Sequence, residues 1–189
     1  MKGVILAGGK GTRLYPLTHA TNKHLLPVYD RPMVYYPIQT LMNAGITEVL
    51  IVTGDVHAGD FINVIKNGHD LGLSHVEYAY QEGGSAGISD ALKYAEDFAD
   101  GDSIAVILGD NTTDADISGA VHGFQTGAMV FLKEVVDPQR FGIPRFSASD
   151  PSVSSASARR GPPPGGAERP MVTPRSDVAS VGRSGGSWR

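Results

Sequence analysis

Cysteine is absent from this 189-residue sequence. The chain therefore has no disulfide, no thiolate nucleophile and no zinc–thiolate site, and its composition suits a reducing cytosol. A long apolar run is also missing at the start of the chain. The only apolar run near the N-terminus is Val4–Ala7, which is far too short for a signal peptide or a membrane span. These absences favour a cytoplasmic protein with no membrane partner.

Positive charge is scarce in the first three quarters of the chain. Residues 1–144 carry 9 Lys and Arg against 17 Asp and Glu, a net charge of −8, whereas residues 145–189 carry +4. Proteins that bind nucleic acids depend on a basic surface, so the acidic body predicts no nucleic-acid partner.

Strand-like and helix-like segments alternate over residues 1–133. Strands that are apolar throughout, each followed by a helix, are typical of a mostly parallel sheet with helices on both faces. The sequence thus predicts the α/β class with a Rossmann-like, doubly wound sheet. The expected strands are Gly3–Leu6, Glu48–Val52, Val76–Tyr80, Ser103–Leu108 and Ala128–Leu132, and the expected helices are Met33–Asn43, 57–67 and Ile88–Phe98.

The composition changes near Pro144. Ser, Gly, Pro and Arg supply 29 of the 45 residues 145–189, and Leu, Ile and Lys are absent there. Such a segment buries too little apolar area to offset its ordering entropy. We therefore predict a domain at 1–144 and a disordered tail at 145–189.

A glycine-rich loop, LAGGKGTRL, follows the first expected strand. Gly8, Gly9 and Gly11 allow a tight turn whose N–H groups point at phosphate oxygens, while Thr12 and Arg13 add donors suited to phosphate. The loop matches neither G-x-x-x-x-G-K-[ST] nor a clean G-x-G-x-x-G. By itself the loop is a weak signal, because a simple strand-to-loop turn has a similar sequence.

Two charged residues follow at positions suited to a phosphate site. Lys23 comes shortly after the loop and can neutralise a second phosphate, although a solvated surface lysine is the commoner case. Asp110 directly follows an apolar strand, where it can hold Mg²⁺ on phosphates or cap the next turn. For His24, with no second ligand nearby, we expect a structural role and no metal.

A third motif, Gln81 and the glycine-rich turn after it, joins a strand to a helix. The Gln side chain can pair with a base edge, and glycines such as Gly87 let the backbone approach a planar base. Alone, the motif indicates only a strand–turn–helix connection.

The order of the motifs is more specific than any one of them. The stretches LAGGKGTRL, NKHLLPV, RPMVYYPIQTLMNAGI, the Gln81 turn, LGDN and KEVVDPQRFG resemble the sugar-nucleotide nucleotidyltransferases, and among them the glucose 1-phosphate thymidylyltransferase branch. The resemblance covers residues 1–144 almost continuously. It implies the nucleotide-diphospho-sugar transferase type of α/β fold, incomplete at the C-terminus.

The resemblance also implies a reaction and a set of roles. Members join a nucleoside triphosphate, here dTTP, to glucose 1-phosphate with Mg²⁺, giving dTDP-glucose, a precursor in dTDP-rhamnose biosynthesis, and pyrophosphate. Arg13 would stabilise the departing pyrophosphate, and Lys23 would contact the reacting phosphates. The remaining implied roles are nucleotide binding by Leu6, Gly8, Gly9, Gly11, Thr12, Gln81 and Gly87, metal binding by Asp110, and sugar contact by Gly142.

The sequence departs from the family pattern in two places. The turn after Gln81 is one residue longer than usual, so Gln81 is a firmer match than Gly87. After Pro144 the acidic-Glu-Lys-Pro motif and a second metal-binding Asp are missing, and Glu168 does not replace them. Residues 145–189 have the amino-acid composition that results when GC-rich DNA is translated in a shifted reading frame. We therefore predict a truncated or frameshifted product.

Three functions stay open at this point. The chain could be an active thymidylyltransferase, a nucleotide-binding remnant without turnover, or a dinucleotide-binding oxidoreductase. The absence of a clean G-x-G-x-x-G motif disfavours the oxidoreductase. A choice of dTTP over UTP or CTP follows only from overall resemblance. The family's homo-oligomers are a possible assembly, weakened here by truncation.

Overall fold

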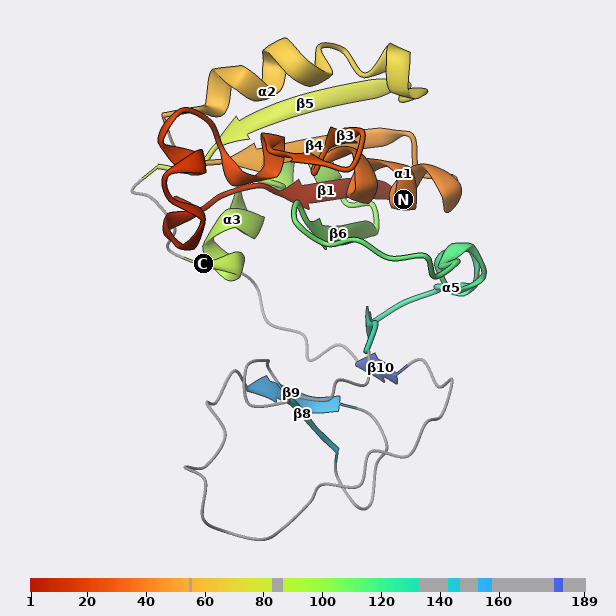
Figure 1. The fold of residues 1–189 in the computed structure, drawn as a ribbon. Coiled ribbons are helices and arrows are strands. Elements are labelled where there is room, and N and C mark those ends of the chain that lie inside the picture. The colour runs from red at the N-terminus through yellow and green to blue at the C-terminus, as the bar shows by residue number, and fades with distance from the viewer. Residues whose placement is uncertain (55, 83–86, 133–142, 147–152, 158–178, 182–189) are drawn as a thin grey trace, which may run out of the picture. The chain divides into compact units, whose positions relative to one another are not determined.

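The computed structural model of the chain describes residues 1–54, 56–82, 87–132, 143–146, 153–157 and 179–181 (Figure 1). The chain divides into two compact units, Met1–His122 and Gly123–Arg189. In the part of the chain so described, no helix is both long enough and apolar enough to cross a membrane.

A four-stranded parallel sheet forms the centre of the first unit (Figure 1). Leu6 pairs in register with Val52 on one side and with Leu108 on the other, so the strands end together at one edge. The predicted α/β class and parallel sheet are confirmed. In spatial order the strands are β5 (His75–Tyr80), β4 (Glu48–Thr53), β1 (Lys2–Leu6) and β6 (Ile104–Leu108).

The two central strands, β4 and β1, are buried on both faces, as their apolar sequences predict, whereas the edge strands β5 and β6 are partly exposed. Side chains alternate along a strand, so neighbouring residues face opposite layers. Ile5 packs in a cluster with Ile38 and Phe61 from helices α1 and α2, whereas Val4 packs in a second cluster with Phe98. The helices are α1 (Tyr35–Asn43), α2 (Ala58–Ile65), α3 (Ile88–Lys93), α4 (Glu96–Ala99) and α5 (Ser118–Gly123).

One expected helix is divided. The apolar spacing predicts a continuous helix over Ile88–Phe98, but the structure has α3 and α4 with a break at Tyr94 and Ala95. At the break the backbone N–H groups of Tyr94 and Ala95 bond three residues back, to Ala91 and Leu92. This tighter winding ends the α-helical pattern while Ala91, Ala95 and Phe98 stay on the buried side.

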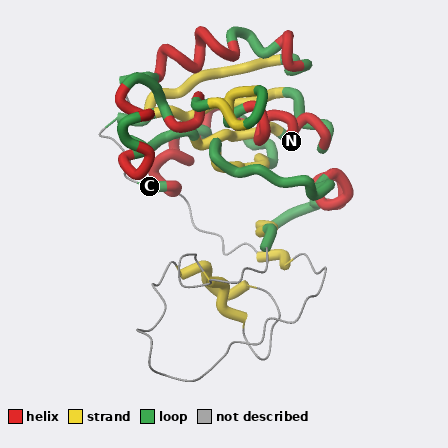
Figure 2. Tube along the Cα trace, in the orientation of Figure 1, coloured by secondary structure: helices red, strands yellow, loops and turns green. Residues whose placement is uncertain are grey.

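Short turns of helix and loop connect β1 to α1 (Figure 2). They carry most of the predicted phosphate-binding residues. The elements are η1 (Thr12–Leu14), η2 (Leu17–His19), η3 (Lys23–Leu25), β2 (Pro27–Val28) and β3 (Arg31–Pro32), and a fourth turn, η4 (His69–Leu71), precedes β5.

The second unit contains two antiparallel strand pairs in its described part. β7 (Ala128–Val130) pairs with β10 (Ala179–Val181), and β8 (Ile143–Phe146) pairs with β9 (Val153–Ser157). Most of the predicted disordered tail lies outside the described residues, so its disorder stays a prediction.

Candidate functional site

A cavity of about 240 Å³ opens at the edge where the parallel strands end. Leu6 closes β1, Gln81 follows β5, and Leu108 closes β6, so three strands deliver residues to one place. Ligands of open α/β sheets bind at this edge. The cavity is lined by Leu6, Gly8, Lys23, His24, Gln81, Gly87, Ile88, Ala91, Leu108 and Asp110.

The structure brings together six of the predicted site residues. These six are Leu6, Gly8, Lys23, Gln81, Gly87 and Asp110, which lie up to 104 positions apart in the sequence. The rest of the glycine loop adjoins the cavity without lining it: Gly9 and Gly11 lie in the loop, and Thr12 and the exposed Arg13 lie in η1. Gly142 falls outside the described residues.

The loop conformation depends on glycine at position 11. Gly11 has φ of 60°, and a Cβ there would come within 3.0 Å of Thr18 Cγ2 and 3.1 Å of Lys23 Cβ. Its carbonyl accepts hydrogen bonds from the Thr18 hydroxyl at 2.9 Å and the Leu14 N–H at 2.8 Å. The loop is thus held against Thr18 and Lys23, and a side chain at position 11 would need a strained backbone and a shift of these two neighbours.

Lys23 and Asp110 form an ion pair at the cavity. Lys23 Nζ donates to Asp110 Oδ2 at 2.5 Å, and the two side chains are 25% and 40% exposed. Burial favours the neutral carboxyl, but the hydrogen bond and charge of Lys23 outweigh it and lower the pKa of Asp110 below 3.8. The cavity therefore presents a cation and an anion side by side.

His24, which follows Lys23 and also lines the cavity, is buried. Its backbone N–H and its ring Nδ1 both bond Asn22 Oδ1, at 2.9 and 2.7 Å, which caps η3. A Cβ on Gly109 would lie 2.9 Å from His24 Cδ2, so glycine at 109 lets the ring pack against the end of β6. Burial, then the charge of Lys23, lower the pKa of His24 to about 4, although Asp110 and the Ala7 backbone oppose this.

We expect His24 to make the chain less stable as the pH falls from about 6.5 to about 4. Below pH 6.5 the unfolded chain protonates this imidazole, whereas the folded chain keeps it neutral down to about pH 4. The full shift corresponds to roughly 3 kcal/mol of unfolding free energy. Urea unfolding between pH 7 and pH 4.5 measures it.

A matched pair of variants isolates the contribution of His24. His24→Gln should flatten the pH dependence in this range, whereas His69→Gln, at an exposed histidine, should reproduce the wild-type profile. An unchanged profile in His24→Gln would show that other groups cause the loss of stability.

On the other side of the cavity, Gln81 is 3% exposed and bonded to helix α3. Its Nε2 donates to Asp90 Oδ2 at 2.7 Å, and its backbone N–H donates to the Thr53 carbonyl at 2.7 Å. Its Oε1 lies beside Gly8, since a Cβ on Gly8 would be 3.5 Å from it. The Gln81 amide therefore links the glycine loop to α3.

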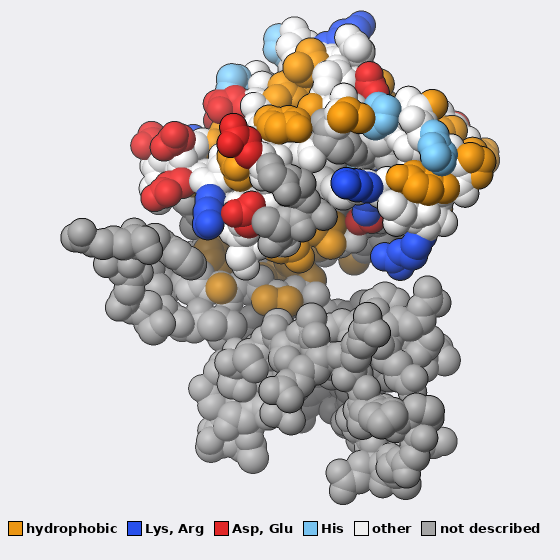
Figure 3. All heavy atoms as spheres, turned by 90° about the vertical axis from the view of Figure 1, so that its left-hand side faces the viewer, with side chains coloured by type: hydrophobic (Ala, Val, Ile, Leu, Met, Phe, Trp, Pro, Cys, Tyr) orange, Lys and Arg blue, Asp and Glu red, His pale blue; other side chains and the backbone are white. Residues whose placement is uncertain are grey.

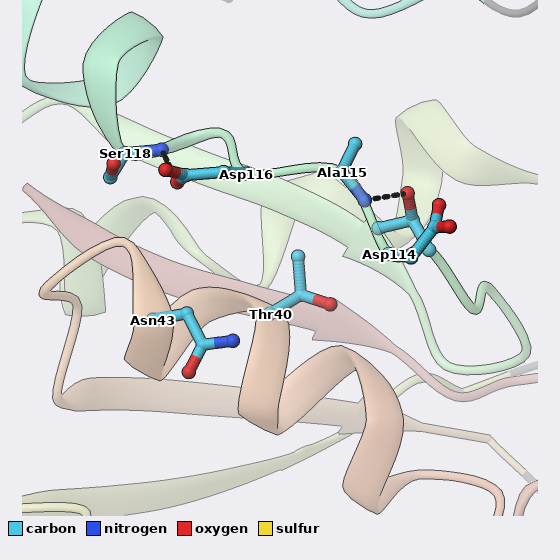
Figure 4. Close-up of a pocket in the computed structure, with 7 residues that line it drawn as sticks. Thr40, Asn43, Asp114, Ala115, Asp116 and Ser118 are labelled. Carbon is cyan, nitrogen blue, oxygen red and sulfur yellow. Dashed lines mark hydrogen bonds between the residues drawn. The ribbon is translucent and has the colours of Figure 1, made fainter.

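A second, larger cavity of about 390 Å³ lies between α1 and the segment that follows β6 (Figure 4). Within it, Thr113 Oγ1 accepts the Ala115 N–H at 3.0 Å and Asp116 accepts the Ser118 N–H at 2.9 Å. The hydrogen bond from Ser118, the first residue of α5, lowers the pKa of Asp116. The Asp116 carboxylate thus satisfies the backbone N–H at the first residue of α5. The lining also includes Thr40, Asn43 and Asp114.

Charged side chains of both signs occur on the side of the molecule toward which β1 and β5 run (Figures 1 and 3). Acidic side chains gather toward one part of this face, and Lys and Arg side chains stand apart from one another. The visible face therefore offers separate positive positions instead of a continuous basic stripe.

The donor set suits a magnesium ion that is shared with phosphates. In the described ranges, no group of three or more His, Cys, Asp and Glu could hold a metal by itself. Mg²⁺ is commonly held by one or two carboxylates together with substrate phosphates and water. Asp110, partly exposed at the cavity and ionised at neutral pH, fits that pattern.

The sequence patterns did not identify several residues of the site. The apolar lining residues Ile88, Ala91 and Leu108 have the pattern of ordinary core residues, so no signal marks them. Asn22 was detectable, because Asn is a preferred N-cap and it directly precedes the KHL turn. Asp90 acts through a contact nine positions away that no local pattern predicts.

Comparison with known proteins gives one family over most of the chain. The family described as nucleotidyl transferase matches residues 2–156, which extends beyond the predicted domain end at residue 144. A glucose-1-phosphate thymidylyltransferase of Neisseria meningitidis is 40% identical over 162 residues, covering 82% of this chain and 54% of the relative. One of Mycobacterium tuberculosis is 36% identical over 185 residues, covering 96% and 59%.

Solved structures agree with this similarity. A Bacillus anthracis protein assigned as glucose-1-phosphate thymidylyltransferase, in complex with sucrose, has a TM-score of 0.75 and 37% identity, covering 96% of this chain and 69% of that one. A UDP-glucose pyrophosphorylase with UDP-glucose has a TM-score of 0.50 at 24% identity, which concerns the fold alone. The chain spans about half the length of the curated relatives it matches.

Proposed function

This chain belongs to the nucleotidyl transferase family, and we propose that it joins dTTP to glucose 1-phosphate, giving dTDP-glucose and pyrophosphate. Its relatives carry the name of this activity over up to 96% of the chain. Membership of this family argues against the oxidoreductase alternative.

One observation carries the proposal. A single cavity at the carboxyl edge of the sheet combines the glycine loop, a Lys–Asp pair and a glutamine at the end of β5. Its charged side, with Gly8, Lys23 and Asp110, suits phosphates and a cation. Its other side, with Gln81, Ile88 and Ala91, combines apolar surface with a polar amide, which suits a base.

The chemistry needs charge and positioning more than proton transfer. A phosphate oxygen of glucose 1-phosphate, already anionic, attacks the α-phosphorus of dTTP. The bond from that phosphorus to the bridging oxygen of the β-phosphate breaks, and pyrophosphate leaves with the electron pair. Two anions must therefore approach each other, and charge develops on the leaving group.

The residues divide this work as follows. The N–H groups of Gly8, Gly9 and Gly11, with Thr12, hold the triphosphate, and Lys23 neutralises the reacting phosphates. Arg13 supports the departing pyrophosphate. Leu6, Gln81 and Gly87 bind the nucleoside.

Two further assignments complete the proposal. Asp110 would hold Mg²⁺, which when bound supplies positive charge to the phosphates. Gly142 would approach the sugar. The cytoplasmic location, the homo-oligomer and the dTDP-rhamnose pathway stay predictions from sequence.

A pyrophosphate-release assay with dTTP, glucose 1-phosphate and Mg²⁺, run beside a dTTP-binding titration, tests the proposal. Turnover that needs both substrates supports it. Binding without turnover indicates a nucleotide-binding protein instead, and absence of both contradicts the assignment of the cavity. Parallel assays with UTP and CTP determine the base preference.

A further inference from the structure

We propose that Asp90 is a positioning residue for base selection: it holds the Gln81 amide so that its oxygen faces the cavity and accepts the N3–H of a thymine or uracil base. This inference rests on the proposed function, since it concerns the nucleotide of that same site. The inference adds Asp90, which lies outside the cavity lining, to the proposed nucleotide site. It also explains how the site would discriminate against cytosine.

The orientation of the Gln81 amide follows from its partner. An ionised carboxylate only accepts hydrogen bonds, so the atom of Gln81 that lies 2.7 Å from Asp90 Oδ2 must be the donor Nε2. Asp90 is ionised at neutral pH, because the hydrogen bonds from Gln81 and then Lys93 lower its pKa below 3.8. The acceptor Oε1 is left between the backbones of Gly8, which lines the cavity, and Gly54, where an added Cβ would lie 3.5 and 3.6 Å from it.

A second hydrogen bond, made by the residue directly after helix α3, holds the segment that contains Gln81. One turn beyond Asp90, the Tyr94 hydroxyl accepts the Glu82 N–H at 3.1 Å. Asp90 in α3 thus bonds Gln81, and Tyr94 directly after α3 bonds Glu82, so both residues that follow β5 are held. Burial of Gln81, at 3% exposure, holds its side chain in place, so the orientation of the amide changes only by a half-turn that exchanges Oε1 and Nε2.

A fixed acceptor distinguishes the pyrimidines. Thymine and uracil carry a hydrogen on N3 and donate it to a carbonyl oxygen. Cytosine in the same position presents the N3 lone pair, so two acceptors would face each other in a buried place. Such an unmade hydrogen bond weakens binding by about tenfold or more.

The test measures dissociation constants of dTTP, dCTP and inorganic tripolyphosphate, with Mg²⁺, by calorimetric titration of the whole chain. In the wild type we expect dTTP to bind about tenfold or more tightly than dCTP. In Asp90→Asn, whose side chain can donate as well as accept, the Gln81 amide can turn over. The preference should then fall to about threefold or less, while tripolyphosphate affinity changes less than about twofold.

Asp97→Asn is the control, because it removes the same charge from an exposed position on α4. It should keep the wild-type preference. A preserved preference in Asp90→Asn, or an equal loss in Asp97→Asn, overturns the inference, as does a wild type that binds both nucleotides equally.

Failure of the proposed function has a different signature: the wild type then binds neither nucleotide, or it binds dTTP in preference to dCTP without releasing pyrophosphate. If Asp90→Asn does not fold, Asp90→Ala replaces it, with the same expected loss of preference. Uniform weakening of dTTP, dCTP and tripolyphosphate in a folded variant would indicate a merely structural role and would also overturn the inference.

Discussion

Replacing Lys23 by methionine should lower turnover by about 10²–10³-fold, the size of effect seen when one preorganised charge stabiliser is removed. Methionine keeps the apolar stem that packs near Gly11 but removes the ammonium group. Asp110 would then face the anionic substrates without its cation, so repulsion adds to the lost attraction. We expect weaker dTTP binding together with slower turnover.

The measurement combines a pyrophosphate-release assay with a dTTP titration. Lys10→Met is the matched control, because Lys10 lies in the glycine loop near the cavity but is exposed and outside the cavity lining. It should retain most of the activity. Near-normal turnover in Lys23→Met would remove this lysine from the reaction and leave it as the structural partner of Asp110.

Arg13→Ala is the second large effect, with an expected loss of about 10²-fold or more in turnover. The exposed Arg13 belongs to η1 and does not line the cavity, so the side chain is free to reach a phosphate group beyond it. If it supports the departing pyrophosphate, its contribution grows as the bond breaks. The rate should therefore fall much more than the affinity for dTTP.

Arg31→Ala is the control for this prediction. Arg31 is an exposed arginine whose guanidinium already pairs with Asp30, at 2.7 and 2.8 Å. Its replacement should leave turnover within about twofold of the wild type, the scale of a surface ion pair. An Arg13→Ala variant that turns over like Arg31→Ala would falsify the proposed role of Arg13.

The layers of the fold could be predicted from local patterns. Val4–Leu6 and Val49–Val52 are apolar at every position, which is possible only where both faces of a strand are buried. Helix ends were less predictable. Ile88–Phe98 has one apolar stripe, yet the helix breaks at Tyr94, because a stripe records which side is buried and not how tightly the backbone winds.

The sequence by itself determined the motifs, and hence the family and the chemical types of the site: a glycine loop, a lysine, an aspartate after β6 and a glutamine after β5. These signals are local, because each depends on a short run of neighbouring residues. They already named six of the residues that line one cavity.

Only the tertiary structure decided which side chains meet. Lys23 and Asp110 pair across 87 positions, His24 packs against Gly109, and Asp90 turns the Gln81 amide. The physical reason is that a parallel sheet gathers the ends of strands that are distant in sequence. Hydrogen bonds and close packing at that edge depend on distances and directions that no local pattern encodes.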